Sequence, residues 1–340
     1  MRSAHLYMTL ALVSAPLVSC LSSDEADLTE IGSAFSQVFT PEIEPNGASA
    51  TATPLVGNSA VAFGSINPLA DRDFYSFQAN PGDRVYAMTS SQFSVNGSTD
   101  MDLNVRGTDG TTLIEFDDQN GTFGGFSPVI AGAQITTAGT NFLEASYYLD
   151  GNRVQPYQLH FAKQSGAPGP EAEPNDTTAT ATPLNAAGYA SGALSSATDV
   201  DVYAITLNAG DTVFAALDLD PERDNAETAG SLSLSPLGGS TFTVNDLGDA
   251  GPDAEGLVAT VKAAGTYFIS VAGTTAGTYQ LSVTKTAQAT PPGVYNLHEH
   301  GHPEDDPDRA RQSDLDDHDP RQSPHCRPRR VDQPEPHEHA

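Results

Sequence analysis

One stretch of the chain has residue types and spacing that suit zinc chemistry. His298, Glu299 and His302 match the pattern His-Glu-x-x-His, in which two histidines on one helical face bind zinc and the glutamate acts on a metal-bound water. Gly301 lies inside the would-be helix and Pro303 follows directly, so the segment is not expected to form that helix. We therefore predict that the chain is not an enzyme and that this segment binds zinc or nickel only adventitiously.

Carboxylates dominate the charge of the chain. There are 44 acidic residues against 15 lysines and arginines, giving a formal net charge of -29. A surface this negative repels phosphate backbones, so we expect no nucleic acid partner. The same carboxylates are hard oxygen ligands, which suits a protein that meets divalent cations outside the cell.

The N-terminal residues predict export. Arg2 precedes an apolar stretch from about Leu6 to Leu17 that is too short to span a membrane, so residues 1–19 are predicted to be a signal peptide. Residues 17–20 resemble the lipobox of bacterial lipoproteins, which implies lipidation of Cys20 and a membrane anchor there. The expected location is the bacterial cell envelope, at the outer membrane or cell surface. The alternative is an ordinary secretory signal with an incidental cysteine.

A long internal repeat defines the domain organisation. The phrase Glu-x-Glu-Pro-Asn at 42–46, followed by Ala-Thr-Ala-Thr-Pro-Leu at 50–55, returns at 171–175 and 179–184. The correspondence continues through Asp71 to Phe77 and Asp199 to Ile205, so each copy is long enough to close a core of its own. The predicted parts are a tether at 20–40, a first module at 41–163, a linker at 164–169, a second module at 170–285 and a tail at 286–340.

The fold class follows from residue periodicity. Apolar residues alternate with polar ones in short runs separated by glycine and aspartate turns, as at Tyr203, Ile205 and Leu207. This pattern predicts an all-β protein with two tandem antiparallel β-sandwich, jelly-roll-like domains. Further strands are expected at 84–89, 102–106, 112–116, 141–148, 212–217, 231–234, 241–244 and 256–261. Tyr75, Tyr157, Tyr203 and Tyr279 are expected in the core or on a sheet face, and one of Tyr147 and Tyr148 is expected to be exposed.

The tail has a different composition. Residues from 290 onward are rich in proline, histidine, aspartate and arginine and nearly free of aliphatic side chains. Such a segment cannot bury enough apolar area to offset its ordering entropy, so disorder is expected. A genuine tail and a translation-frame error at the end of the gene are both open explanations of this composition.

The order of these motifs resembles a known family. The acidic phrase, a glycine-rich strand entry, Asp-x-Asp followed by Phe-Tyr or Val-Tyr, and a closing Tyr-x-Leu strand are similar to the bacterial pre-peptidase C-terminal (PPC) domain. That family is similar in turn to the collagen-binding domain of bacterial collagenases. The resemblance covers 41–163 and 170–285 and implies compact jelly-roll modules of an exported protein.

The resemblance also implies calcium sites, because the acidic phrase and the aspartate pair supply ligands in calcium-binding relatives. Carried over, the second module offers Glu171, Glu173, Asn175, Asp176, Asp199 and Asp201. The first offers Glu42, Glu44, Asn46, Asp71 and Asp73, with Gly47 where the second has Asp176, so a weaker site is expected there. A metal-free linker turn is the alternative explanation of the phrase.

The expected function is that of a non-catalytic, calcium-binding surface lipoprotein. Its modules would bind an extracellular protein or polysaccharide, or another envelope component. The alternatives are an accessory or truncated part of a secreted peptidase, or a protein that binds metal through its His-rich tail.

Overall fold

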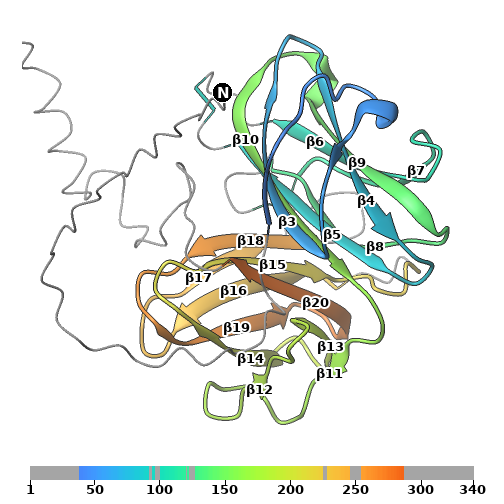
Figure 1. Ribbon diagram of the computed structural model, residues 1–340. Coiled ribbons are helices and arrows are strands. Elements are labelled where there is room, and N and C mark those ends of the chain that lie inside the picture. The colour runs from blue at the N-terminus through green and yellow to red at the C-terminus, as the bar shows by residue number, and fades with distance from the viewer. Residues whose placement is uncertain are drawn as a thin grey trace, which may run out of the picture. The chain divides into compact units, whose positions relative to one another are not determined.

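The computed structural model describes residues 38–91, 94–95, 100–119, 121, 127–224, 228–245 and 254–286 (Figure 1). The predicted signal peptide, Cys20, His298 to His302 and the predicted disordered tail beyond Thr286 lie outside these residues. All the described residues belong to one compact unit. None of the helices among them has the length and apolar character needed to cross a membrane.

The described chain is all-β, as predicted, and contains four five-stranded sheets. In the first module, one sheet has the order β1 (Val38–Pro41), β3 (Ser59–Ile66), β10 (Val154–Gln164), β5 (Arg84–Ser90) and β8 (Val129–Gln134). The other has the order β2 (Thr53–Pro54), β4 (Arg72–Ala79), β9 (Gly139–Tyr147), β6 (Met101–Arg106) and β7 (Leu113–Asp117). Two short 3-10 helices, η1 (Ser49–Thr51) and η2 (Tyr148–Asp150), lie in its connections.

The second module repeats this arrangement strand for strand. Its first sheet has the order β11 (Gly169–Pro170), β13 (Tyr189–Leu194), β20 (Gly277–Thr286), β15 (Thr212–Asp218) and β18 (Ala254–Thr260). Its second has the order β12 (Thr182–Pro183), β14 (Val200–Leu207), β19 (Gly265–Gly273), β16 (Gly230–Pro236) and β17 (Phe242–Asn245). The four sheets confirm two β-sandwich modules, and the two modules have the same strand order.

Each sandwich closes on its own apolar core. Alternate residues of the paired sheets face inward, so Tyr75, Leu103 and Phe161 meet in the first module. Leu217 and Ile269 occupy the corresponding core of the second module. The four tyrosines expected in the core are buried. Tyr147 packs against the first core and Tyr148 is exposed, as predicted, although Tyr148 begins η2 and is not a residue of strand β9.

The outer faces of one sheet from each module share a third apolar cluster. Tyr86, Met88, Val129, Ala131 and Ala162 of the first module pack with Tyr189, Phe214, Ala216, Ala254 and Val258 of the second. Every one of these side chains is at most 5% exposed. Strands β5, β8, β15 and β18 are consequently buried on both faces, which the alternating pattern alone does not predict.

Ion pairs border this cluster. The fully buried carboxylate of Asp218 in the second module accepts from Arg223 Nη1 at 2.6 Å and from Arg84 Nη1 of the first module at 3.3 Å. Arg223 also pairs with Glu115 of the first module, with 3.1 Å between Nη2 and Oε2. The two modules are therefore joined by both apolar and charged contacts.

Candidate functional site

The acidic phrase forms a bridge between the two sheets of each sandwich. In the first module the Glu42 amide donates to Phe63 O of β3 (2.9 Å), which continues the parallel pairing of β1. The Ile43 amide then donates to Thr53 Oγ1 (2.9 Å), and the Phe74 amide of β4 donates to Asn46 O (2.9 Å). These bonds fix the segment beside the start of β4, where Asp73 lies.

The second module builds the same bridge from equivalent residues. The Glu171 amide donates to Ser191 O (2.9 Å), and the Ala172 amide donates to Thr182 Oγ1 (3.1 Å). The Val202 amide donates to Asn175 O at 3.1 Å. Thr53 and Thr182 are the second threonine of the Ala-Thr-Ala-Thr-Pro-Leu phrase. Each has a structural role, because its hydroxyl accepts a hydrogen bond from a backbone N–H of the acidic segment.

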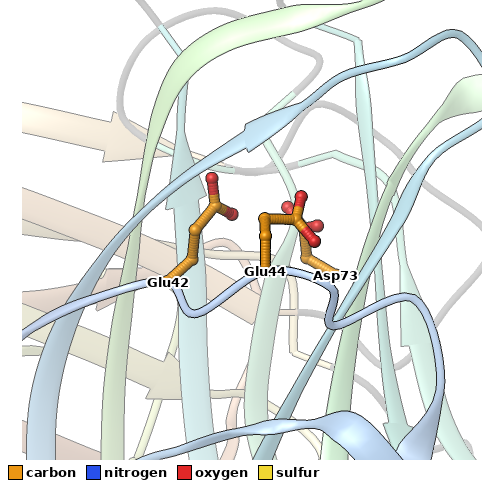
Figure 2. A group of neighbouring side chains, drawn as sticks. All are labelled: Glu42, Glu44 and Asp73. Carbon is orange, nitrogen blue, oxygen red and sulfur yellow. The ribbon is translucent and has the colours of Figure 1, made fainter.

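Each bridge brings three carboxylates together. Glu42, Glu44 and Asp73 each place an oxygen within 4.8 Å of the other two, and Glu171, Glu173 and Asp201 do the same. Figure 2 shows the two glutamates on one segment with Asp73 beside Glu44. The aspartate of each group is fully buried, the first glutamate is half-buried and the second is exposed. Each group therefore has a buried inner side and a solvent-facing outer side.

A buried asparagine amide completes each group. Asn46 and Asn175 are 0% exposed. In one orientation the Asn46 amide nitrogen lies 3.0 Å from both Asp73 Oδ1 and Glu44 Oε2, and the Asn175 nitrogen lies 3.1 Å from Asp201 Oδ1 and 3.3 Å from Glu173 Oε2. In the other orientation Asn175 donates to Thr182 Oγ1 (3.4 Å), and its oxygen faces the carboxylates. The first orientation bridges the acids by hydrogen bonds, and the second offers a cation a fourth oxygen.

Two buried tyrosines hold each aspartate. Tyr157 OH donates to Asp73 Oδ2 at 2.6 Å, and Tyr75 OH lies 2.7 Å from Tyr157 OH. In the second module Tyr279 OH lies 2.7 Å from Asp201 Oδ2 and 2.8 Å from Tyr203 OH. The sequence indicated only that these tyrosines were buried. The available signal for a second role was that Tyr75 and Tyr203 follow the Asp-x-Asp motif, and Tyr157 and Tyr279 begin the closing Tyr-x-Leu strand, at the same place in both copies.

A glycine opposite the tyrosine makes room for this contact. A Cβ atom at Gly64 would lie 2.5 Å from Tyr157 OH, and one at Gly192 would lie 2.2 Å from Tyr279 OH. Both glycines are paired with the tyrosine across the sheet. The glycine of the repeated strand entry is therefore required because the tyrosine hydroxyl crosses over it to reach the acidic group.

Burial shifts the carboxyl pKa values upward. Loss of hydration raises the pKa of Asp73 to about 9 and that of Asp201 to about 8, while the tyrosine hydroxyl acts in the opposite direction on each. Burial likewise raises the pKa of Glu42 to about 7, and neighbouring Glu44 adds to the increase. Without a cation, burial therefore favours the protonated form of Asp73 and Asp201 at neutral pH and makes Glu42 harder to ionise.

The remaining predicted ligands lie outside the two carboxylate groups. Asp71 caps its own turn by accepting from the amides of Asn67 and Arg72, each at 3.0 Å. Asp199 likewise accepts from the Ser195 amide, and hydrogen bonds from Ser195, with a smaller contribution from Asp176, lower its pKa. Asp176 is exposed and lies beside Asp199, and it is not a member of the group around Asp201.

Comparisons with known proteins give only distant similarity. No family model and no curated protein matches this chain. The periplasmic lysozyme inhibitor PliG of Aeromonas hydrophila is 17% identical, with a TM-score of 0.25, and the match covers 38% of this chain and all of that one. The pre-peptidase C-terminal domain of a Bacillus anthracis collagenase is 15% identical, with a TM-score of 0.23, covering 36% of this chain and all of that domain. The CUB1-EGF-CUB2 region of human MASP-1/3 is 9% identical, with a TM-score of 0.21, over 67% and 100% of the two chains.

Proposed function

We propose that each module binds one calcium ion and that the chain is a non-catalytic surface protein. The observation that carries this proposal is the carboxylate group built twice from equivalent residues. Glu42, Glu44 and Asp73 would hold the ion in the first module, with Asn46 as a further ligand. Glu171, Glu173, Asp201 and Asn175 would hold it in the second.

Calcium suits this set because all of its donors are hard oxygens. Three carboxylates within 4.8 Å repel one another when ionised, and burial adds to the cost of ionising the aspartate. A divalent cation removes both penalties and favours the Asn orientation in which the oxygen faces inward. The ion would tie the bridging segment to the neighbouring strand, which is a structural role.

A calcium-dependent rise in melting temperature tests the metal site. Scanning calorimetry of the full chain with millimolar calcium should give a higher Tm than with chelator, because a ligand that binds only the folded state stabilises it. The double variant Asp73→Asn, Asp201→Asn should lose most of this response, since it removes the buried charge from each group. Leu237→Ala, at an exposed position of the second module, serves as the control. Equal Tm values with calcium and chelator would refute the calcium site.

We further propose where the protein is located and what it binds there. The signal-like N-terminus and the Leu17 to Cys20 segment support an exported lipoprotein anchored at the bacterial envelope. The modules would there bind an extracellular polysaccharide or protein, or an envelope partner. Mass spectrometry of the mature N-terminus should find a lipidated Cys20; an unmodified cysteine would refute the anchor. Incubation of the purified chain with casein and gelatin should leave both intact.

A further inference from the structure

A cavity adjoins the acidic group of the second module. Its volume is about 500 Å³, and its wall includes Glu171 and Glu173 together with Pro170, Pro221, Glu222 and Gln280. Gly192 and Tyr279 also line it, so the tyrosine that holds Asp201 forms part of the same wall. Two of the proposed calcium ligands are therefore also cavity residues.

The ligand count leaves calcium incomplete in this site. Glu171, Glu173, Asp201 and Asn175 are four side chains, whereas calcium takes about 6–8 oxygens. Second carboxylate oxygens or water would supply some of the missing oxygens. Because Glu171 and Glu173 belong both to the group and to the cavity wall, a molecule in the cavity is placed to supply the others.

The negative charge of the cavity wall favours an uncharged ligand. Three carboxylates and one Ca²⁺ leave a net charge of about -1, and Glu222 adds another negative charge at the rim. A carboxylate or phosphate ligand would meet this excess negative charge at close range, which disfavours it. A pair of neutral hydroxyls supplies oxygens to the ion without this repulsion and still has protons to donate.

The other wall residues match a hydroxylated ring. Thr278 Oγ1 donates to Glu222 Oε2 at 2.7 Å, which fixes an acceptor at the rim. Gln280 lines the cavity and its Oε1 accepts from Tyr189 OH at 2.6 Å, which leaves the amide nitrogen as the group that could donate to a ligand. Pro170 and Pro221 add apolar surface suited to the C–H face of a sugar. The first module has Pro156 in place of Thr278, so this part of the wall is particular to the second module.

We propose that this cavity binds a neutral saccharide, with two adjacent hydroxyls completing the calcium shell and Glu222 accepting from a further hydroxyl. This inference rests on the proposed calcium site. It identifies the second module as the saccharide-binding one and neutral glycans as the ligand class.

Saturation-transfer NMR of the full chain tests the proposal. The probes are methyl α-mannoside and methyl α-galactoside, which present differently oriented vicinal diols, and glucuronate as the anionic comparison. We expect signal transfer to at least one neutral glycoside in calcium, loss of that signal in chelator, and weaker or no transfer to glucuronate. Glu222→Ala should weaken neutral binding about tenfold, since a charged hydrogen bond is lost, while leaving the calcium-dependent rise in Tm intact.

The outcomes separate this inference from the calcium site. A normal calcium-dependent rise in Tm with no transfer to either neutral glycoside would refute the saccharide site alone. Equal transfer in calcium and chelator, or a preference for glucuronate, would also refute it. An unchanged Tm with calcium would refute both the calcium site and this inference. Leu237→Ala, at an exposed position of the second module outside the cavity wall, should leave glycoside binding unchanged. Unchanged glycoside binding in Glu222→Ala would overturn the assignment to this cavity.

Discussion

Tyr157 and Tyr279 join the hydrophobic core of each module to its acidic group. Their rings are buried within the sandwich, while their hydroxyls contact Asp73 and Asp201 at 2.6 and 2.7 Å. A hydroxyl that bonds a carboxylate oxygen fixes the direction in which the other oxygen points. We therefore regard these tyrosines as positioning residues for the proposed metal site.

Removing one hydroxyl should weaken calcium binding without changing the ligands. Tyr279→Phe keeps the ring in the core but frees Asp201 Oδ2, and loss of such an outer contact typically costs about 10–100-fold in metal affinity. Titration calorimetry with calcium measures the change. Tyr267→Phe is the matched control, because Tyr267 OH bonds only the Ala263 carbonyl among described contacts of its hydroxyl. Equal calcium affinity in wild type and Tyr279→Phe would show that the hydroxyl has no part in the site.

The sequence predicted all three residues of each carboxylate group, but it also predicted ligands that lie outside these groups. The repeat identified Glu42, Glu44 and Asp73 because an acidic phrase preceded an Asp-x-Asp strand in both copies. Asp71 shares that motif, but it lies one residue before β4 begins, in a turn where it accepts from the amides of Asn67 and Arg72. Sequence spacing does not reveal which member of such a pair faces inward.

The alternation of apolar and polar residues predicted most of the strands. It did not predict that some of these strands are buried on both faces. The expected strands at 84–89, 102–106 and 212–217 correspond to β5, β6 and β15. Strand β8 was missed, although Val129, Ile130 and Ala131 form a short apolar run. Such runs, like Val213 to Leu217, are typical of strands buried on both sides. They were the available signal that a second layer covers these sheets.

His160 lies on the face of β10 that packs against Phe214 of the second module. Its burial should make the stability of the protein depend on pH. It is 1% exposed, its ring lies 5.7 Å from that of Phe214, and neither ring nitrogen has a hydrogen-bond partner among the described residues. Burial lowers its pKa from 6.5 to about 3. Between these two pH values the unfolded chain therefore binds one more proton than the folded chain. The free energy of unfolding is not reduced by this effect above about pH 6.5, and it decreases as the pH falls toward 3.

Comparison with His160→Phe isolates this effect. The free energy of urea unfolding of wild type should fall relative to the variant by up to about 1.4 kcal/mol per pH unit below pH 6.5. Burial raises the pKa of Glu115 and Asp218, which have the opposite effect, but both groups are present in the two proteins and cancel in the difference. Parallel pH profiles would show that His160 is hydrated in solution.

At the scale of the whole molecule, the two modules form one unit in the structure. The linker at 164–169 contains serine, glycine and proline, and this composition predicts few contacts between the modules and separate unfolding. The structure instead packs the outer faces of two sheets together and pairs Arg84 of one module with Asp218 of the other. A Cβ atom at Gly132 would lie 2.0 Å from Asp218 Oδ2, so the interface also depends on close backbone approach. The composition of the linker alone does not predict an interface of this kind between the modules.

Phe214→Ala tests whether the modules unfold together. Phe214 is 1% exposed because the first module covers it, and it points away from its own core. Replacing a buried phenylalanine with alanine costs about 3–5 kcal/mol, whereas a change on a solvent-facing sheet surface stays within about 0.5 kcal/mol. We expect wild type to unfold in urea in one transition and Phe214→Ala to unfold at lower urea, with the two modules separating into distinct transitions. Leu237→Ala, in the same module but 71% exposed, should leave the curve unchanged. If Phe214→Ala behaves like Leu237→Ala, the modules are independent in solution and the linker-based prediction is restored.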